Sequence, residues 1–279
     1  MKTTCISNQD KYLEISDLQK SWTTDQSPNK FSGSGVYISQ LNIRPCERVA
    51  VLGPSGSGKS TFLKLLAKDI EPNNGSIYFI DKQIRDWLHH DLSFYRAVLP
   101  QAQELSFDFS VDLIVSLGCI NHQNLSAFQV RALVKECLKS AMATHLVGQS
   151  YMNLSGGEKA RVQLARVFAQ MWDVRDGLLL VDEPFAALDP YLQIALLSNL
   201  YEFAKQRSLT IIAILHDVNH AIHYFDRGIF IREGQMSLDI PMIKVSRIDF
   251  ENLYGIKFLE LHGDNGERYF FPIQANKLC

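Results

Sequence analysis

The sequence predicts an α/β fold, and three features of the chain support this prediction. Short apolar runs of strand length alternate with helical stretches along the 279 residues. Three of these runs, at 48–52, 177–182 and 210–215, are continuously apolar, as is typical of strands buried on both faces of a parallel sheet. Residues 85–151 read mainly as helix, which indicates a helical segment inserted into the α/β core.

Local patterns predict the remaining elements. Ser126 and Gln129 form a capping box ahead of an apolar stripe over 130–141, which predicts a helix that packs through this stripe. The polar stretch 23–30 contains a proline and is expected to be an exposed loop. The other elements are expected as helices at 62–67, 160–171, 190–201 and 246–254, strands at 12–22, 36–43, 76–80, 257–262 and 268–271, and a hairpin over 228–239.

The composition is that of an ordinary globular protein. The chain is 46% hydrophobic and 21% charged, with a formal net charge of −2, so it has ample material for a core. The chain has no excess of basic residues, so its charge does not indicate a nucleic-acid partner. The five cysteines are scattered, without a C-x-x-C pair, which favours a reducing compartment and free thiols.

No stretch of the sequence predicts a membrane span or a secretion signal. The richest apolar runs are of strand length, far below the roughly 18 residues that a spanning helix needs. The first residues contain no apolar run of the kind that a signal peptide requires. The chain is therefore expected not to cross a membrane by itself.

A glycine-rich loop follows the apolar run 48–52. It matches the pattern G-x-x-x-x-G-K-[ST], and its residues are Gly53, Pro54, Ser55, Gly56, Ser57, Gly58, Lys59, Ser60 and Thr61. In such a loop successive backbone amides and the start of the next helix face one anion. Lys59 would reach the β- and γ-phosphates of a nucleotide, and the Ser60 hydroxyl would bind magnesium. The alternative is a flexible turn, but the strand before and the helix after it supply the context of a phosphate-binding loop.

A second glycine-rich turn opens the helix predicted at 160–171. Ser155, Gly156 and Gly157 stand at its start, where helix amides attract anions. Alone, Ser-Gly-Gly is also a common linker fragment. Two phosphate-competent loops in one chain require either two ligands or one ligand held between two chains.

Two carboxylates end the strand predicted at 177–182. Asp182 is placed as the acid that holds magnesium through water in phosphate-loop nucleotidases, and Glu183 could orient and deprotonate the attacking water. Further on, Asp189 can cap the helix that Pro190 starts, and capping alone explains it adequately.

Several single residues gain meaning only from their context. Gln101 follows an apolar run and carries no chemistry by itself, and His216 at a strand end could bind a γ-phosphate or be structural. Trp22 could stack on adenine or be a plain surface or core residue. His220 and His223 have helical spacing, but no cysteine or glutamate completes a metal-ligand set.

Taken in their order, these motifs resemble the full set of an ABC-transporter ATPase subunit. The resemblance implies a RecA-like ATP-binding core with an antiparallel β subdomain, formed by 1–84 and 160–279. It also implies a helical subdomain at 85–159 that carries the signature motif. ATP and Mg²⁺ are the expected cofactors, with Ser60, Gln101 and Asp182 around the metal.

The same resemblance assigns roles to single residues. Glu183, His216, Lys59 and Gln101 are expected to act in hydrolysis, with Gln101 also sensing a membrane partner. Residues 154–158 are expected to close over the γ-phosphate bound by a second copy, and Asp189 to link the two sites. Trp22 falls where the family has its adenine-stacking aromatic residue.

The partners follow from the family as well. We expect an ATP-sandwiched homodimer bound to a polytopic permease at the cytoplasmic face of the membrane, and through the permease a substrate-binding protein. Importer ATPases for hemin are most similar, with those for ferric siderophores and vitamin B12 nearby, while Cys46 and Phe185 depart from that group. The residues behind this subgroup are 86–87, 96–101, 105–111, 162–167 and 215–219. The alternative is a soluble, non-transport ABC ATPase acting on ribosomes or DNA, for which a second ATPase half, a coiled-coil insertion or a basic surface is expected, and the sequence contains none.

Overall fold

The computed structural model describes residues 12–22, 35–101, 108–122, 124–183, 185 and 188–273. The expected loop at 23–30 and residues 105–107 of the stretch 105–111 lie outside these ranges. The described residues belong to two compact units, one spanning 87–211 and one combining the chain before residue 87 with residues 212 onward. The unit boundary falls within strand β8 (Thr210–Ile214). The subdomain boundaries predicted at 84/85 and 159/160 stay a prediction.

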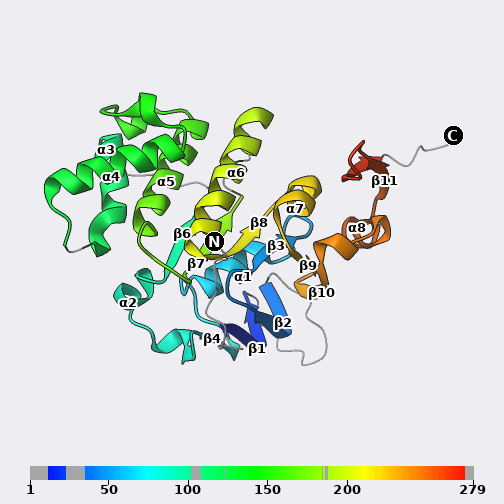
Figure 1. Cartoon of the computed structure of the whole chain (residues 1–279). Coiled ribbons are helices and arrows are strands. Elements are labelled where there is room, and N and C mark those ends of the chain that lie inside the picture. Colours follow the sequence, from blue (N-terminus) through cyan, green and yellow to red (C-terminus); the bar gives the residue numbers. More distant parts are fainter. Residues whose placement is uncertain are drawn as a thin grey trace. The chain divides into compact units, whose positions relative to one another are not determined.

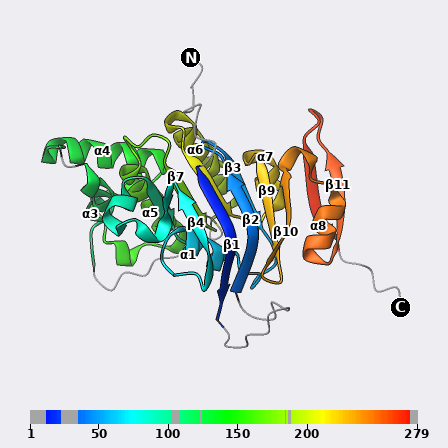
Figure 2. The same ribbon diagram turned by 90° about the horizontal axis from the view of Figure 1, so that it is seen from below.

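The unit that contains the phosphate-type loop is built on a mixed sheet (Figure 1). Within it the strand order is β5-β4-β1-β2-β10-β9-β3, and β1 pairs antiparallel with both β2 and β4. β3 runs parallel to β9, and the predicted hairpin is β9 with β10. The strands are β1 (Leu13–Ser21), β2 (Gly35–Ile43), β3 (Arg48–Leu52), β4 (Asn74–Phe79), β5 (Lys82–Gln83), β9 (Arg227–Arg232) and β10 (Gln235–Pro241). Figure 2 shows β1 and β2 running side by side.

One arginine joins several strands of this sheet. Arg227 on β9 donates to both carboxylate oxygens of Asp239 on β10, at 2.5 and 2.6 Å, and to Glu47 at 3.1 Å. It also donates to the backbone carbonyl of Asn42 on β2 at 2.8 Å. The hydrogen bonds that it donates to Asp239, together with the negative charge of Glu47, raise the pKa of the Arg227 guanidinium. This network fixes β2, β9 and β10 against one another.

The end of the chain adds a small aromatic layer to the same unit. Helix α8 (Arg247–Tyr254) is followed by the antiparallel pair β11 (Lys257–His262) and β12 (Arg268–Ile273). Phe250 of α8 lies 5.1 Å from Phe270, 5.6 Å from Phe230 and 5.7 Å from Phe258, measured between ring centroids. Helices α1 (Lys59–Leu66) and α7 (Val218–Tyr224), with the short 3-10 helices η1 (Ile84–Asp86) and η5 (Met242–Lys244), complete the unit.

The unit spanning 87–211 is mainly helical. β6 (Arg96–Leu99) pairs in parallel with β7 (Leu178–Asp182), and helices α3 and α4 pack against α5. The helices are α2 (His89–Ser93), α3 (Val111–Leu117), α4 (Ala127–Ser140), α5 (Gly156–Gln170) and α6 (Pro190–Arg207), with the 3-10 turns η2 (Gly118–Asn121), η3 (Thr144–Leu146) and η4 (Tyr151–Asn153). No helix in the described ranges has the length and apolarity that crossing a membrane requires.

The caps confirm why these helices begin where they do. The predicted capping box of Ser126 and Gln129 is present at the start of α4, and the Asp189 carboxylate accepts from the Leu192 amide at 3.0 Å at the start of α6. The buried face of α4 consists of Leu133, Val134, Cys137 and Leu138, as its apolar stripe predicted.

The prediction of free thiols holds for part of the described chain. Cys119 and Cys137 are buried and free, and burial raises the pKa of both thiols. It is wrong for Cys46, which is disulfide-bonded. Spacing along a sequence does not reveal which thiols a fold brings together.

Candidate functional site

The phosphate-type loop lies between β3 and α1, held by two close backbone approaches. A side chain on Gly53 would place its Cβ 2.0 Å from the Ile231 carbonyl oxygen on β9. One on Gly58, which has φ +100° as the N-cap of α1, would lie 2.3 Å from the Gly35 carbonyl oxygen. Only glycine fits at these positions, because β2 and β9 press on the loop from outside.

The side chains of this loop fit an anionic ligand. Lys59 is only 5% exposed, and its ammonium donates to the carbonyl oxygens of Gly53 at 2.9 Å and Pro54 at 2.8 Å. The Ser57 hydroxyl is buried with no hydrogen-bond partner among the described residues. A buried lysine and an unsatisfied hydroxyl in a loop at a helix N-terminus favour a ligand that carries negative charge and accepts hydrogen bonds.

Trp22 follows the strand end that touches this loop. Ser21 pairs with Gly35 in the β1–β2 ladder, and Gly35 is the residue that approaches Gly58. The Trp22 side chain is 56% exposed, so it is not a core residue, and the ammonium of Lys20 lies 5.0 Å from its ring centroid. The strand pairing therefore places the residue before this exposed aromatic side chain opposite Gly35, which touches the loop.

His216 belongs to the same group. The amide of Leu215, directly after β8, donates to the carbonyl of Val51 on β3 at 3.3 Å, so His216 comes just beyond a residue bonded to the strand that leads into the loop. Its side chain is exposed, and the next residue, Asp217, caps α7 by accepting from the Asn219 amide at 2.7 Å. The loop, Trp22 and His216 thus all belong to this unit.

The two carboxylates and Gln101 form a second group, in the unit spanning 87–211. Because β6 and β7 are parallel, the residues that follow them meet at one edge of the sheet. There the Gln101 side-chain amide donates to the Glu183 carboxylate at 3.1 Å. Glu183 comes directly after Asp182, the last residue of β7, with φ +45°, a left-handed conformation that is uncommon for residues other than glycine. Backbone strain of this kind is often found at functional positions.

The second glycine-rich turn begins α5 as predicted. Ser155 is its N-cap, and its amide and hydroxyl donate to the Glu158 carboxylate at 2.8 and 2.7 Å. The hydrogen bond from the Ser155 side chain, with that from its amide, lowers the pKa of Glu158. Gly156 and Gly157 are the first helical residues, whose amides have no partner within a helix, so they remain open to an anion.

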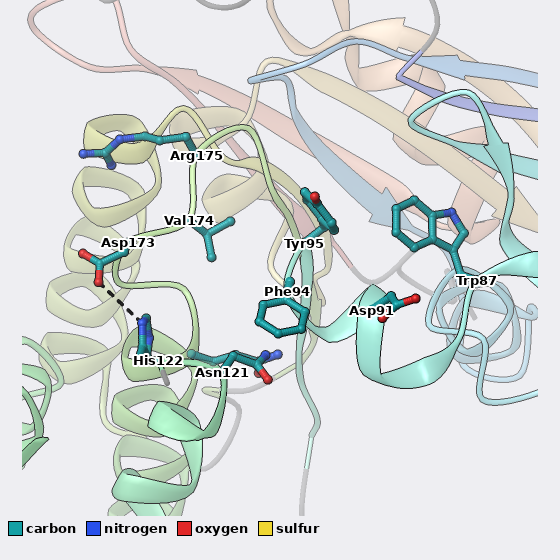
Figure 3. A pocket seen from close by; sticks show the side chains of 10 residues that line it. Trp87, Asp91, Phe94, Tyr95, Asn121, His122, Asp173, Val174 and Arg175 are labelled. Atoms are coloured by element: carbon teal, nitrogen blue, oxygen red, sulfur yellow. Dashed lines mark ion pairs between the residues drawn. The ribbon is translucent and has the colours of Figure 1, made fainter. Parts of the chain in front are cut away.

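A pocket opens in the same helical unit, and Trp87, one of the residues behind the subgroup resemblance, helps to line it. Its volume is ≈ 570 Å³, and Figure 3 shows the rings of Trp87, Phe94 and Tyr95 facing it. Across from them the His122 ring is fixed between Asp173, 3.4 Å from Nδ1, and the Ala169 carbonyl oxygen, 2.8 Å from Nε2. Next to this pocket along the chain, α3 and η2 expose three apolar side chains at helical spacing, Leu113, Leu117 and Ile120.

Sequence reasoning missed parts of both groups. Gly35 contacts the loop, and Lys20 contacts Trp22. Glycine and lysine are common in any sequence, and nothing in the pattern around either residue marks it as part of a site. The contact of Gln101 with Glu183 joins residues 82 positions apart. The described residues contain no group of three or more His, Cys, Asp or Glu side chains that could hold a metal ion. In nucleotide sites Mg²⁺ is usually bound by one or two protein groups together with phosphate oxygens.

Comparisons with known proteins agree with this arrangement. Residues 38–186 match a protein-family model described as ABC transporter. The Hemin import ATP-binding protein HmuV of Pseudomonas aeruginosa is 42% identical over 200 residues, which cover 71% of this chain and 78% of that protein. The protein of the same name from Gloeobacter violaceus is 37% identical over 243 residues, or 82% and 88% of the two chains.

Solved structures show the same fold. A metal-chelate type ABC transporter in an inward-facing conformation superposes with a TM-score of 0.75 at 22% identity, covering 95% of this chain and 98% of that one. The cbiO1 protein of Clostridium perfringens, part of the ABC transporter complex cbiONQ, superposes with a TM-score of 0.70 at 27% identity, covering 88% and 94%.

Proposed function

The chain belongs to the ABC transporter family, and on this premise we propose that it is the ATP-hydrolysing subunit of an importer for hemin. The observation that carries the proposal is the phosphate-type loop with its buried Lys59, in a chain whose relatives at 42% and 37% identity are hemin import ATP-binding proteins. The second candidate function is that of an ATPase subunit in an importer of ferric siderophores or vitamin B12. A soluble, non-transport ATPase is a weaker alternative, because these relatives are import proteins.

Nucleotide binding is assigned to the loop and to Trp22. The amides of Ser55 to Thr61 surround the phosphates, and Lys59 exchanges the carbonyl oxygens of Gly53 and Pro54 for phosphate oxygens. The exposed ring of Trp22 stacks on adenine. Ser60, Asp182 and Gln101 would hold Mg²⁺, which would neutralise phosphate charge.

Hydrolysis is assigned to Glu183 with the groups around it. Its carboxylate orients the attacking water and accepts its proton, while Gln101 holds that carboxylate through the 3.1 Å hydrogen bond. His216 donates to the γ-phosphate, and Lys59 stabilises the charge that develops there. Each of these groups acts by position and charge, as phosphoryl transfer requires.

The exposed start of α5 is assigned to a second copy of the chain. Ser155, Gly156 and Gly157 close over the γ-phosphate that the second copy holds, so that two nucleotides join a homodimer. Their amides are available for this contact because the capping box fixes the helix start and leaves the first helical amides unpaired. Asp189, which caps α6, links the two sites.

The membrane partner is assigned to the helical unit. Leu113, Leu117 and Ile120 form an exposed apolar stripe beside the ≈ 570 Å³ pocket, and such a stripe suits a helix of a polytopic permease. Docked there, the subunit lies at the cytoplasmic face of the membrane, and the permease in turn meets the substrate-binding protein.

The test is to purify a tagged Glu183→Gln variant with ATP from detergent-solubilised membranes and to identify what it captures. The expected result is a polytopic permease together with a loss of hydrolysis of at least about 100-fold, because a general base is worth that much. Glu202→Gln, an exposed change on α6, serves as the matched control. Capture of ribosomes or nucleic acid would contradict the importer assignment. The reconstituted complex, offered hemin, a ferric siderophore and vitamin B12 in turn, then distinguishes the substrates.

A further inference from the structure

We propose that Lys20 is a positioning residue for the nucleotide base, because it holds the indole ring of Trp22 from one side. The proposal rests on the nucleotide site proposed above and adds a residue to it. Lys20 lies in β1, and Trp22, two positions further on, directly follows its last residue. The Lys20 ammonium lies 5.0 Å from the Trp22 ring centroid, within the range of a cation–π interaction.

The backbone beneath this pair is fixed from two sides. Lys20 pairs with Val36 and Ser21 with Gly35 in the ladder of β1 and β2. On the other side, the Ser21 amide donates to the Asn73 side chain at 2.7 Å, and the Asn73 amide donates to the Gln19 carbonyl at 2.8 Å. These bonds therefore fix the backbone from which the Trp22 side chain extends.

The ring itself has much less support than its backbone. It is 56% exposed, although tryptophan is usually well buried in folded proteins. The Trp22 side chain can rotate about χ1 and χ2. It loses this rotamer freedom when a base stacks on the ring, and the lost entropy weakens nucleotide binding. A cation on one face limits that freedom while more than half of the side chain stays exposed.

The position of the pair makes this support relevant to the nucleotide. Gly35, the partner of Ser21, has its carbonyl oxygen 2.3 Å from the position that a Gly58 Cβ would take, so the end of β1–β2 lies directly on the phosphate-binding loop. A base that extends from phosphates in this loop meets the Trp22 side of the strand end. Lys20 thus acts on the base through Trp22 and not through the phosphates.

The experiment measures ATP hydrolysis of the full chain with Lys20→Met and Lys20→Arg. An exposed cation–π contact corresponds to about a two- to five-fold change in an equilibrium constant. We expect Lys20→Met to raise the KM for ATP by about that factor with kcat unchanged, and Lys20→Arg to restore the wild-type KM. Lys205→Met is the matched control, since it removes a similar contact, 5.5 Å from the Tyr201 ring centroid, on helix α6.

A spectroscopic readout separates positioning from general stability. The chain has three tryptophans, so 5-fluorotryptophan labelling gives three ¹⁹F resonances, and Trp22→Phe identifies the one from Trp22. Lys20→Met is expected to shift and narrow this resonance in the nucleotide-free protein, as a freer ring would, and Lys20→Arg to leave it near its original position. An unchanged resonance together with an unchanged KM would overturn the proposal.

The outcomes also distinguish this proposal from the proposed function. If the wild-type chain binds no ATP, the nucleotide site itself is wrong. If the wild type binds ATP and Trp22→Ala weakens binding while Lys20→Met does not, only the role of Lys20 is wrong. An equal fall of kcat in Lys20→Met and Lys205→Met would also overturn it, because that fall would reflect stability.

Discussion

The side-chain amide of Gln101 donates a 3.1 Å hydrogen bond to the carboxylate of Glu183, at the edge where the parallel strands β6 and β7 end. One residue is the expected sensor of the membrane partner, and the other is the proposed general base. The contact gives a direct physical route from a change at the loop of Gln101 to the group that handles the water.

Gln101 is expected to act in hydrolysis through Glu183. Gln101→Ala removes the donor that orients the carboxylate, and we expect it to lower kcat by about 10-fold, a modest part of what a positioned base contributes. In a Glu183→Gln background the same substitution should have no further effect, because the group through which it acts is gone. A double-mutant cycle on kcat measures this coupling. Independent, multiplying losses would show that Gln101 acts elsewhere.

The glycines of the phosphate-type loop are expected to differ sharply in how much stability is lost when alanine replaces them. Gly58→Ala places a Cβ 2.3 Å from a backbone oxygen at φ +100°, whereas Gly56→Ala at φ +77° meets nothing within 4 Å. Gly56→Ala therefore carries only the left-handed strain of about 1–2 kcal/mol. Gly58→Ala should lower the free energy of unfolding by clearly more, about 3 kcal/mol or above, since β2 must shift as well. Urea unfolding of both variants checks this order, and equal losses would contradict the close packing of loop and strand.

Asp189 has a structural role and a proposed functional one, and two substitutions separate them. Asp189→Ala removes the acceptor for the Leu192 amide and should lower the free energy of unfolding by about 1 kcal/mol. Asp189→Asn keeps a capping oxygen and should retain most of this stability. If Asp189 also links two nucleotide sites, the asparagine variant will still lose cooperativity in ATP hydrolysis. Full activity with full cooperativity in Asp189→Asn would reduce its role to capping.

The start of α5 should respond to acid. The pKa of Glu158 is lowered below its ordinary 4.5, mainly by the hydrogen bond from the Ser155 side chain. A carboxyl group whose pKa is lower in the folded state stabilises the protein above the unfolded pKa, and this stabilisation is lost as the pH falls through the folded pKa. The wild type should therefore lose more stability between pH 5 and 3 than Glu158→Gln, which keeps a neutral capping box like that of Ser126 and Gln129. Thermal melts across this range provide the measurement, and Gln129→Glu should introduce a similar acid sensitivity at α4.

Local patterns were enough to predict the elements that hold the site. The strand at 48–52, the capping box of α4, the cap of α6 and the helix after Ser155 all stand where the sequence placed them, because each depends on residues within one turn or one strand. Helix α2 lies within 85–151, which reads mainly as helix, but its bounds were not predicted because five residues are too few to show a period. Strand β12 runs through Pro272 to Ile273, two residues beyond its predicted end, because proline is tolerated in an edge strand.

The contacts that complete the site could not be predicted in this way. The approach of Gly35 to Gly58 and the network of Arg227 depend on strand register, and the position of Lys20 over Trp22 depends on side-chain rotamers. Strand register is set by the whole sheet, so it cannot be predicted from the types of the residues that it brings into contact. The bond between Gln101 and Glu183 likewise requires that β6 and β7 be neighbours and parallel.

The two hydrogen bonds that Lys59 makes to its own loop have a kinetic consequence. Its ammonium is desolvated, and carbonyl oxygens of its own loop, 2.9 and 2.8 Å away, orient it. Capturing a nucleotide then replaces one pair of oxygen partners by another, and the roughly 2 kcal/mol of rotamer entropy of a lysine has already been given up. The encounter should therefore proceed in one concentration-dependent phase in stopped-flow records, with a rate limited by diffusion and charge and not by a rearrangement of the loop.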